Sequence, residues 1–97
     1  MARLMYDRLL KRMRELVRTR RYIMPLHAED EMEADGLTVY DVESTIFTGR
    51  IAERQKDRLS KEWKYLVRGQ SLAAEDVTLV VKFGPTGKLV FITVFRE

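Results

Sequence analysis

The stretch that decides the fold is DVTLVVKFGPTGKLVFITVF, residues 76–95. Two runs rich in β-branched and aromatic residues, 76–83 and 88–95, flank the four residues GPTG. Such runs on either side of a glycine-containing turn predict two antiparallel strands joined by a hairpin. Because both runs are apolar on both faces, we expect these strands to be central and covered by helices on at least one side.

Two further strands are predicted upstream of this hairpin. The segment RIAERQK, residues 50–56, is polar and suits an edge strand. In EWKYLVRG, residues 62–69, large apolar residues alternate with mostly basic ones. This period of two is typical of a strand with one face toward a core.

The first part of the chain shows a helical period instead. Met5, Leu9, Met13 and Leu16 form an apolar stripe, and the opposite side is basic. This pattern predicts an amphipathic helix within residues 1–21. Pro25 disfavours helix in the residue before it, so residues 22–24 should be extended and suit a short edge strand.

Two more helices are predicted before the strands. One is short, acidic and opens near His27, with Gly36 as its C-terminal cap. The other begins at Thr38 as N-cap, with Asp41 three residues on, and ends at Gly49. Helices followed by strands predict an α+β fold with a four-stranded antiparallel sheet and an optional short edge strand.

Length and composition favour one domain, residues 1–97, in which a basic helix at 1–21 is added to a core at 22–97. The chain has no cysteine, which excludes disulfides, thiolate zinc sites and a cysteine nucleophile. Neither a glycine-rich phosphate loop nor a metal-ligand spacing is present, so we expect no cofactor and no metal. The arginine-rich start fits neither a secretion signal nor a membrane span, which predicts a cytoplasmic protein without membrane contact.

Charge is unevenly distributed along the chain. Residues 3–21 carry a net charge of +6, residues 29–43 carry −7 and residues 50–68 carry +4. Such segregation suggests a surface that faces a polyanion such as RNA. The alternative is that each block is a solvated helix or strand face.

His27 is the only histidine, and the chain has many arginines and lysines. These residue types fit metal-independent RNA cleavage, in which a base removes the 2′-hydroxyl proton and cations stabilise the charge on the phosphorane. Histidine can act as base or acid near neutral pH, and arginine can donate two hydrogen bonds to one phosphate. The structural alternative is that the His27 ring caps a backbone group or packs beside Leu26.

Four segments in this order resemble a small bacterial family, domain of unknown function 4258. They are LHAEDEMEADGLTVYDVESTIFTGRIAER from Leu26, YLVRG from Tyr65, VTLVVKF from Val77 and GKLVFITVFRE from Gly87. The resemblance covers about residues 23–96, without the basic helix. That family is similar in turn to the RelE- and BrnT-like toxins, small ribonucleases with a RelE/barnase-like fold of helices followed by a sheet.

The resemblance implies a toxin-like endoribonuclease of a toxin–antitoxin pair, which acts on free RNA or on the ribosome and is bound by a cognate antitoxin. It implies catalytic roles for His27, Arg68 and Thr93. Two positions depart from the family pattern. Glu31 stands where members usually have an arginine, and Phe95 stands where they have a tyrosine.

Five basic strand residues are candidate RNA contacts at the rim of a groove on the sheet: Arg50, Arg54, Lys56, Lys64 and Lys82. For Arg68, the alternative to a substrate contact is a structural ion pair. For Trp63 and Tyr65, the two alternatives are stacking on RNA bases and packing in the core. Two other functions stay open for the whole chain. In the first, the chain is a non-catalytic module that binds nucleic acid or an acidic partner. In the second, it is a homo-oligomer that associates through the stripe from Met5 to Leu16.

Overall fold

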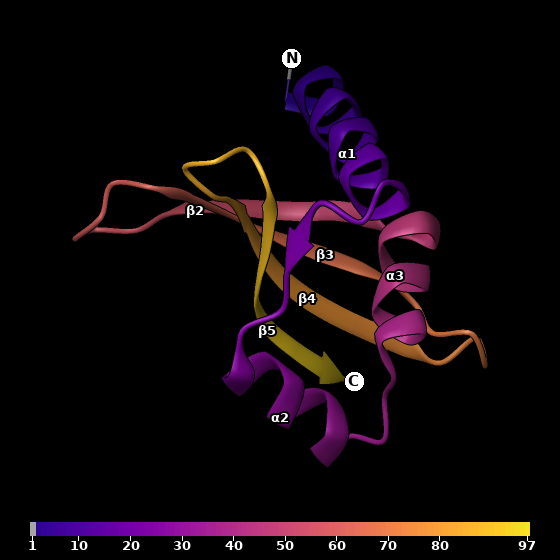
Figure 1. Ribbon diagram of the computed structural model, residues 1–97. Helices are drawn as coiled ribbons and strands as arrows, with labels where there is room; N and C mark the ends of the chain where they lie inside the picture. Colours follow the sequence, from indigo (N-terminus) through magenta and orange to yellow (C-terminus); the bar gives the residue numbers. More distant parts are fainter. Residues whose placement is uncertain (1) are drawn as a thin grey trace.

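The computed structural model describes residues 2–97, which form an α+β fold of three helices and a five-stranded mixed sheet (Figure 1). The elements in chain order are α1 (Ala2–Arg18), β1 (Tyr22–Ile23), α2 (Leu26–Ala34), α3 (Val39–Thr48), β2 (Arg50–Lys56), β3 (Trp63–Gln70), β4 (Asp76–Phe83) and β5 (Leu89–Arg96).

The sheet has the strand order β1-β5-β4-β3-β2. Strands β2 to β5 pair antiparallel, as the sequence predicts. The short edge strand β1 is also present, and it pairs parallel to β5 through Tyr22 with Leu89 and Ile23 with Val90. The sheet is therefore five-stranded and mixed, whereas the sequence predicts four antiparallel strands with an optional edge strand of no stated direction. Because β1 is only two residues long, most of β5 has no strand neighbour on its outer side.

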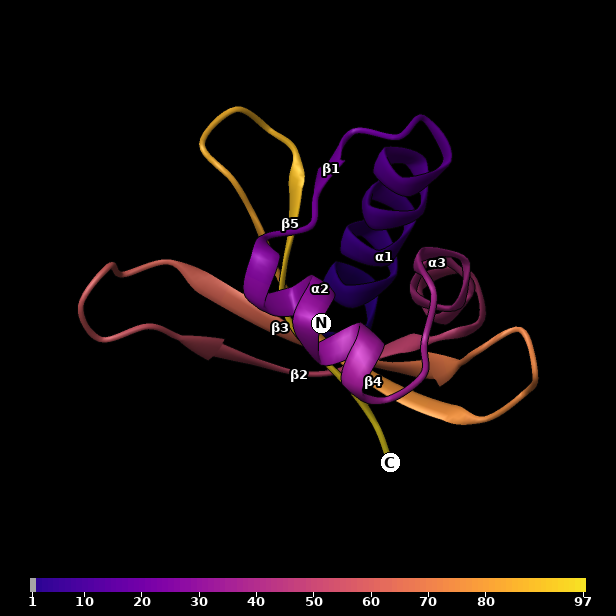
Figure 2. The same ribbon diagram turned by 60° about the horizontal axis from the view of Figure 1, so that its bottom comes forward.

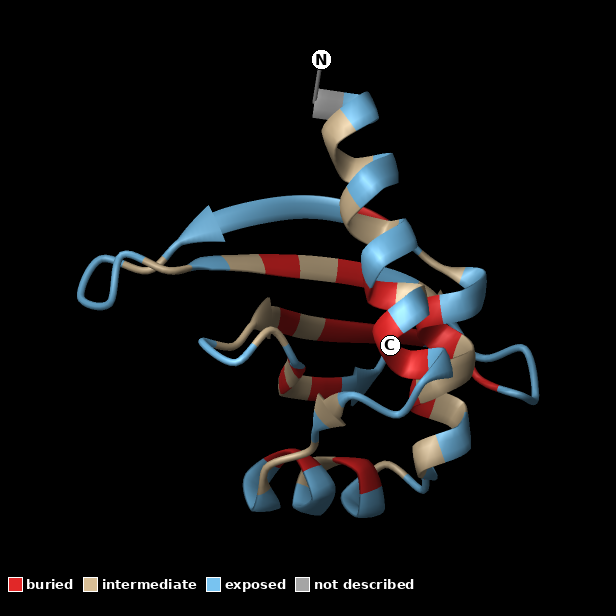
Figure 3. Cartoon of the chain, turned by 45° about the horizontal axis from the view of Figure 1, so that its top comes forward, coloured by how far each residue is buried: buried red, intermediate tan, exposed pale blue. Residues whose placement is uncertain are grey.

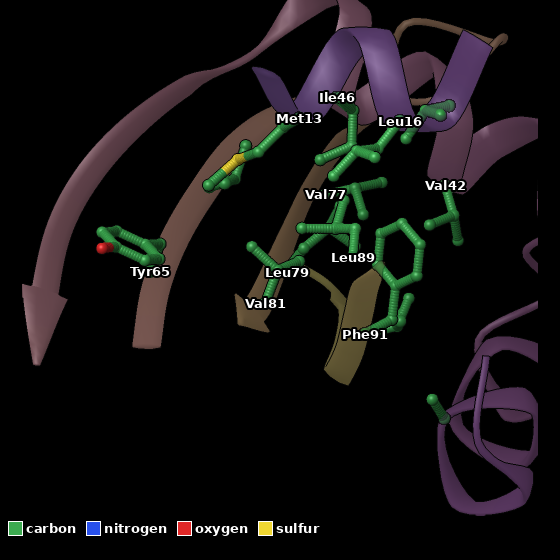
Figure 4. Close-up of a cluster of buried hydrophobic side chains, with 14 of the residues drawn as sticks. Met13, Leu16, Val42, Ile46, Tyr65, Val77, Leu79, Val81, Leu89 and Phe91 are labelled. Carbon is green, nitrogen blue, oxygen red and sulfur yellow. The ribbon is translucent and has the colours of Figure 1, made fainter. Parts of the chain in front are cut away.

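The core lies between one face of the sheet and the helices α1 and α3 (Figures 3 and 4). Helix α1 contributes Met13, Leu16 and Val17, all of which are buried. The predicted apolar stripe thus fills the core at its C-terminal half, whereas Leu4 near the start of α1 is 56% exposed. The side chains that meet these helices alternate along β3 and β4, whereas in β5 a register shift separates Phe91 from Val94. These strand residues are Ile51, Tyr65, Val67, Val77, Leu79, Val81, Leu89, Phe91 and Val94.

Helix α3 approaches the sheet unusually closely at two glycines. A Cβ atom built on Gly49, the C-cap of α3, would lie 2.7 Å from the carbonyl oxygen of Arg68 in β3, and one on Gly69 of β3 would lie 2.3 Å from the carbonyl oxygen of Thr45 in α3. Gly49 has a φ of −91°, so the left-handed backbone that often ends a helix does not occur there. Glycine is required at both positions because nothing larger fits between α3 and the sheet.

The helix ends show the capping that the sequence predicts. The Thr38 side chain accepts a hydrogen bond from the backbone N–H of Asp41, and the Asp41 carboxylate accepts one from the backbone N–H of Thr38. Gly36 follows α2 with a φ of +68°, a conformation that glycine adopts without strain. At the other end of α3, Arg14 donates to the carbonyl oxygens of Ile46 (3.1 Å) and Gly49 (2.9 Å). A cation thus satisfies carbonyls that the last helical turn leaves free.

Across residues 2–97, no helix combines the length and the apolar character needed to cross a membrane.

Candidate functional site

The two faces of the sheet differ in what covers them. Helices α1 and α3 cover one face, and the other face carries the side chains that alternate with the core positions. On this open face Arg68 pairs with Thr78. Lys64 precedes and Lys82 follows a core residue of the pair Tyr65 and Val81. Arg50 pairs with Arg68, and Thr93 pairs with Val80. The open face therefore carries four of the predicted site residues from β3, β4 and β5, together with Arg50 from β2.

Arg54 and Lys56 lie on the opposite face. The pairing of β2 with β3 shifts register between Ile51 and Glu53, so the side chains after this bulge change face. The Arg54 guanidinium lies 4.2 Å from the centre of the Trp63 ring, and the Lys56 ammonium lies 5.6 Å from it. The five predicted RNA contacts are thus divided between two faces and do not form one rim.

Tyr65 and Trp63, the other residues with two alternative roles, also point to the helix-covered face. Tyr65 is buried and packs edge-on against Phe83, with ring centres 5.9 Å apart. Trp63 is 38% exposed, and its ring makes cation–π contacts with Arg54 and Lys56 of β2.

His27 lies in the first turn of α2, which runs along the outer edge of β5 (Figure 2). Its Nε2 atom is 2.7 Å from the carbonyl oxygen of Ile92. A carbonyl oxygen only accepts hydrogen bonds, so Nε2 carries the proton and donates. In the neutral ring, Nδ1 is then the nitrogen with a free lone pair. One contact therefore fixes both the position of the ring and the nitrogen that is available as a base.

Two carboxylates, Glu31 of α2 and its C-cap Asp35, also bond to the backbone of β5 further along the strand, as acceptors. Glu31 accepts a hydrogen bond from the backbone N–H of Val94 (3.0 Å), and Asp35 accepts one from that of Arg96 (2.7 Å). Four residues of helix advance about 6 Å and two residues of strand about 6.6 Å, so the spacings of the two elements match. Side chains of α2 thus replace the strand partner that β5 lacks beyond β1.

A cavity of about 410 Å³ opens beside His27. Its wall brings together residues from α2, the β2–β3 loop, β3, β4 and β5: Pro25, His27, Asp57, Ser60, Glu62, Lys64, Lys82, Val90, Phe91 and Ile92. Three of the predicted site residues, His27, Lys64 and Lys82, therefore share one concave surface although the chain separates them widely.

The two lysines of this cavity are held by carboxylates from the β2–β3 loop. Lys64 lies 3.0 Å from Asp57, and Lys82 lies 3.1 Å from Glu62. The pKa of Asp57 is held well below its usual range, chiefly by the backbone N–H of Ser60 and then by the Lys64 ammonium. The Asp57 carboxylate is therefore ionised at neutral pH, and both cations are fixed in position and electrostatically balanced.

Arg68 and Thr93 lie outside this cavity. Arg68 lines a separate cavity of about 430 Å³ with Arg50, and its Nε atom is 3.9 Å from a carboxylate oxygen of Glu97. Four residues of strand separate Arg68 from Lys64, a distance of about 13 Å. Thr93 shares the open face but does not belong to the wall of either cavity. The structure thus separates the predicted base from the predicted arginine.

Residues that the sequence analysis did not select also shape the His27 cavity. Asp57, Ser60 and Glu62 come from the β2–β3 loop and pair with or flank the lysines. Their signal in the sequence is a DxxS turn, because Asp57 accepts hydrogen bonds from the backbone N–H groups of Leu59 and Ser60. In residues 2–97 no three His, Cys, Asp or Glu side chains are grouped as metal ligands.

Comparison with known proteins places the chain in a family. No curated protein and no solved structure matches it. A family match extends over residues 26–96, which spans α2, α3 and strands β2 to β5 and includes every residue of the His27 cavity except Pro25. Helix α1 and strand β1 precede the matched region. On this match, the chain belongs to the family described as Domain of unknown function (DUF4258).

Proposed function

We propose that the protein is a metal-independent endoribonuclease of the RelE-like toxin type, with the His27 cavity as its active site. The observation that supports this most is the shared wall of His27, Lys64 and Lys82, because RNA cleavage needs a base and cations within reach of one phosphate. The resemblance to RelE- and BrnT-like toxins supports the same reaction class, and it adds a cognate antitoxin as the partner.

The proposed reaction uses the free nitrogen of His27. Nδ1 takes the proton of a ribose 2′-hydroxyl, and the 2′ oxygen bonds to phosphorus while the bond from phosphorus to the 5′ oxygen breaks. The products are a 2′,3′-cyclic phosphate and a 5′-hydroxyl, which receives its proton from water. Lys64 and Lys82 stabilise the charge on the phosphorane. In this proposal they take the role that the resemblance gives to Arg68.

The loop carboxylates compete with the substrate for these lysines. A phosphate that enters the cavity has to draw Lys82 from Glu62 and Lys64 from Asp57. Asp57 also holds the loop through backbone hydrogen bonds, whereas the Glu62 carboxylate has Lys82 as its one polar partner among residues 2–97. Removal of the Glu62 charge should therefore free one cation without loss of the turn.

Variants of His27 separate its catalytic role from its structural one. The amide of His27→Gln can still donate to the Ile92 carbonyl but cannot act as a base, whereas His27→Ala loses both functions. We expect His27→Gln to reduce cleavage at least about 100-fold with an unchanged unfolding midpoint. Glu62→Gln should raise the cleavage rate at low RNA concentration. Asp30→Asn, on the exposed side of α2, is the matched control and should cleave like the unmodified chain.

Cleavage is measured on labelled single-stranded RNA and on translating ribosomes, with the cyclic phosphate as the diagnostic product. Expression in bacteria should arrest growth, and His27→Gln should relieve the arrest. If His27→Gln cleaves as fast as the unmodified chain, or if neither substrate is cut, the proposed activity is refuted.

A second candidate is a non-catalytic module that binds RNA or an acidic partner. The observation in its favour is that Lys64 and Lys82 are already paired with carboxylates, so the cavity is electrically balanced. This candidate requires binding that weakens steeply with salt and is the same for His27→Gln and the unmodified chain.

A further inference from the structure

A strongly basic hollow of the molecule lies away from the His27 cavity. It is a groove of about 580 Å³ between α1 and the β4–β5 turn. The residues that line it are Arg8, Lys11, Arg12, Glu15, Leu16, Arg21, Thr86 and Gly87. None of these eight residues lines the His27 cavity, and six of them precede residue 26, where the family match begins.

The four cations of this groove have no acidic partner within residues 2–97. Arg8, Lys11, Arg12 and Arg21 form none of the ion pairs found there. The one carboxylate in the wall, Glu15, is bound on both oxygens by Arg18, at 2.6 and 2.7 Å. The pKa of Glu15 is lowered chiefly by its hydrogen bonds with Arg18 and least by the charge of Arg21, so the main partner of this carboxylate is a cation outside the groove.

This arrangement differs from that of the His27 cavity, where both lysines have a carboxylate within 3.1 Å. Four like charges around one hollow repel one another, and an anion in the groove would remove that repulsion. Arg12 is held in place on the Phe83 ring, 5.4 Å from its centre, and Arg21 donates to the Thr19 hydroxyl at 3.0 Å. Two of the four cations are thus positioned before any ligand binds.

The shape of the groove and the burial of α1 indicate the type of anion. Arginine donates two hydrogen bonds to one phosphate, and three of the lining residues are arginines. A cavity of several hundred cubic ångströms admits a ligand the size of a nucleotide. A membrane surface fits less well, because Met13, Leu16 and Val17 of α1 are buried in the core and cannot insert into lipid.

We infer that the groove between α1 and the β4–β5 turn binds the phosphate backbone of single-stranded RNA, as a second contact outside the cleavage site. This inference rests on the proposed RNA substrate. It assigns to α1 the task of holding RNA next to the hairpin whose opposite side borders the His27 cavity, through Val90 and Phe91. Affinity and cleavage are then carried by different residues.

The test measures binding without chemistry. The probe is a fluorescent 2′-O-methyl oligouridylate of about 12 nucleotides, which lacks the nucleophile and cannot be cleaved. Arg8→Glu with Lys11→Glu removes two groove cations whose side chains form no ion pair within residues 2–97. Arg3→Glu with Arg58→Glu makes the same change of net charge at exposed positions outside the groove. Binding is followed by anisotropy at several salt concentrations, and cleavage of unmodified RNA is measured in parallel.

We expect the groove variant to lose at least about tenfold in affinity, and its plot of log affinity against log salt to be less steep by about 1.4. The control variant should lose less than about threefold. Equal losses in the two variants, no binding by the unmodified chain, or groove-dependent binding to anionic phospholipid vesicles in place of RNA would each overturn the inference. If the groove variant loses RNA affinity but the unmodified chain does not cleave RNA, the inference about the groove is upheld and the proposed activity is refuted. If the unmodified chain cleaves RNA and the groove variant binds RNA with unchanged affinity, the inference is refuted and the proposed activity is upheld.

Discussion

The close approach of α3 to the sheet gives a prediction that can be worked from distances. In Gly69→Ala the new Cβ would lie 2.3 Å from the Thr45 carbonyl oxygen and 2.9 Å from the Cα atom of Gly49, whereas ordinary contact begins at 3.4 Å. All of the nearest atoms are backbone atoms, so α3 and the start of β2 have to move by about 1 Å. Overpacking typically costs about 1–3 kcal/mol, and we expect about 3 kcal/mol here because no side chain can yield.

Urea unfolding, followed by far-ultraviolet circular dichroism, measures this loss. With a slope of about 1.5 kcal/mol per molar urea, the midpoint should fall by about 2 M. In Gly49→Ala the new Cβ would lie 2.7 Å from the carbonyl oxygen of Arg68, next to Gly69 in β3, so the same separation of α3 from β3 relieves this contact. The double variant should therefore lose about 1–2 kcal/mol less than the sum, since α3 moves only once.

A third glycine provides the control. In Gly84→Ala the nearest atom is a methyl group of Val90, at 3.2 Å, so only a side chain has to adjust and the cost should stay below about 1 kcal/mol. If Gly69→Ala changes stability by less than about 0.5 kcal/mol, or if the two losses near α3 simply add, the steric reasoning is refuted.

Two further outcomes are expected. Thr78→Val should raise the free energy of unfolding by about 1 kcal/mol, because the Thr78 hydroxyl is buried and has no hydrogen-bond partner among residues 2–97; lower stability in urea unfolding would contradict this. The hydrogen bond from the backbone N–H of Thr38 is the main cause of the lowered pKa of Asp41. The ionised carboxylate therefore stabilises the fold at pH values above the pKa that Asp41 has in the unfolded chain. This stabilisation is lost as the pH falls through the lower pKa of the folded state. Asp41→Asn should cost about 1 kcal/mol at pH 7 and progressively less below about pH 4, and equal losses at pH 7 and pH 3 would exclude this explanation.

The strands were predictable because their signals are local. The segments 50–56 and 76–83 have the bounds that the sequence predicts, and the other two long strands differ by one residue at each end. Dense β-branched and aromatic runs bounded by glycine leave little choice of element. The same holds for the helix that begins at Thr38, whose reciprocal capping bonds need only residues three apart.

The faces of the strands were less predictable, because a bulge changes them. By simple alternation Arg50, Arg54 and Lys56 would share one face of β2. The register shift between Ile51 and Glu53 moves Arg54 and Lys56 to the side of Trp63. A single inserted residue such as Ala52 has no mark in the sequence, so an argument from alternation alone places cations on the wrong side.

The cavity itself was not predictable in the same way, because it depends on where α2 docks. Its walls come from α2, from the β2–β3 loop and from three strands, and nothing local relates position 27 to positions 64 and 82. Only the order β1-β5-β4-β3 brings these residues to one end of the sheet. The sequence was enough to select a candidate base and a set of candidate cations. The topology of the sheet decides that His27 lies near the lysines and not near Arg68.

The docking of α2 also gives a physical account of Glu31. The resemblance to the family leads one to expect an arginine at this position, which would be a phosphate contact. A guanidinium cannot accept a hydrogen bond, whereas the Glu31 carboxylate accepts one from the Val94 N–H. The substitution therefore favours closure of the sheet edge over a fixed positive charge near the base. If RNA is the substrate, its phosphate has to be held by Lys64, Lys82 and cations elsewhere, and the groove on α1 holds four such cations without acidic partners in residues 2–97.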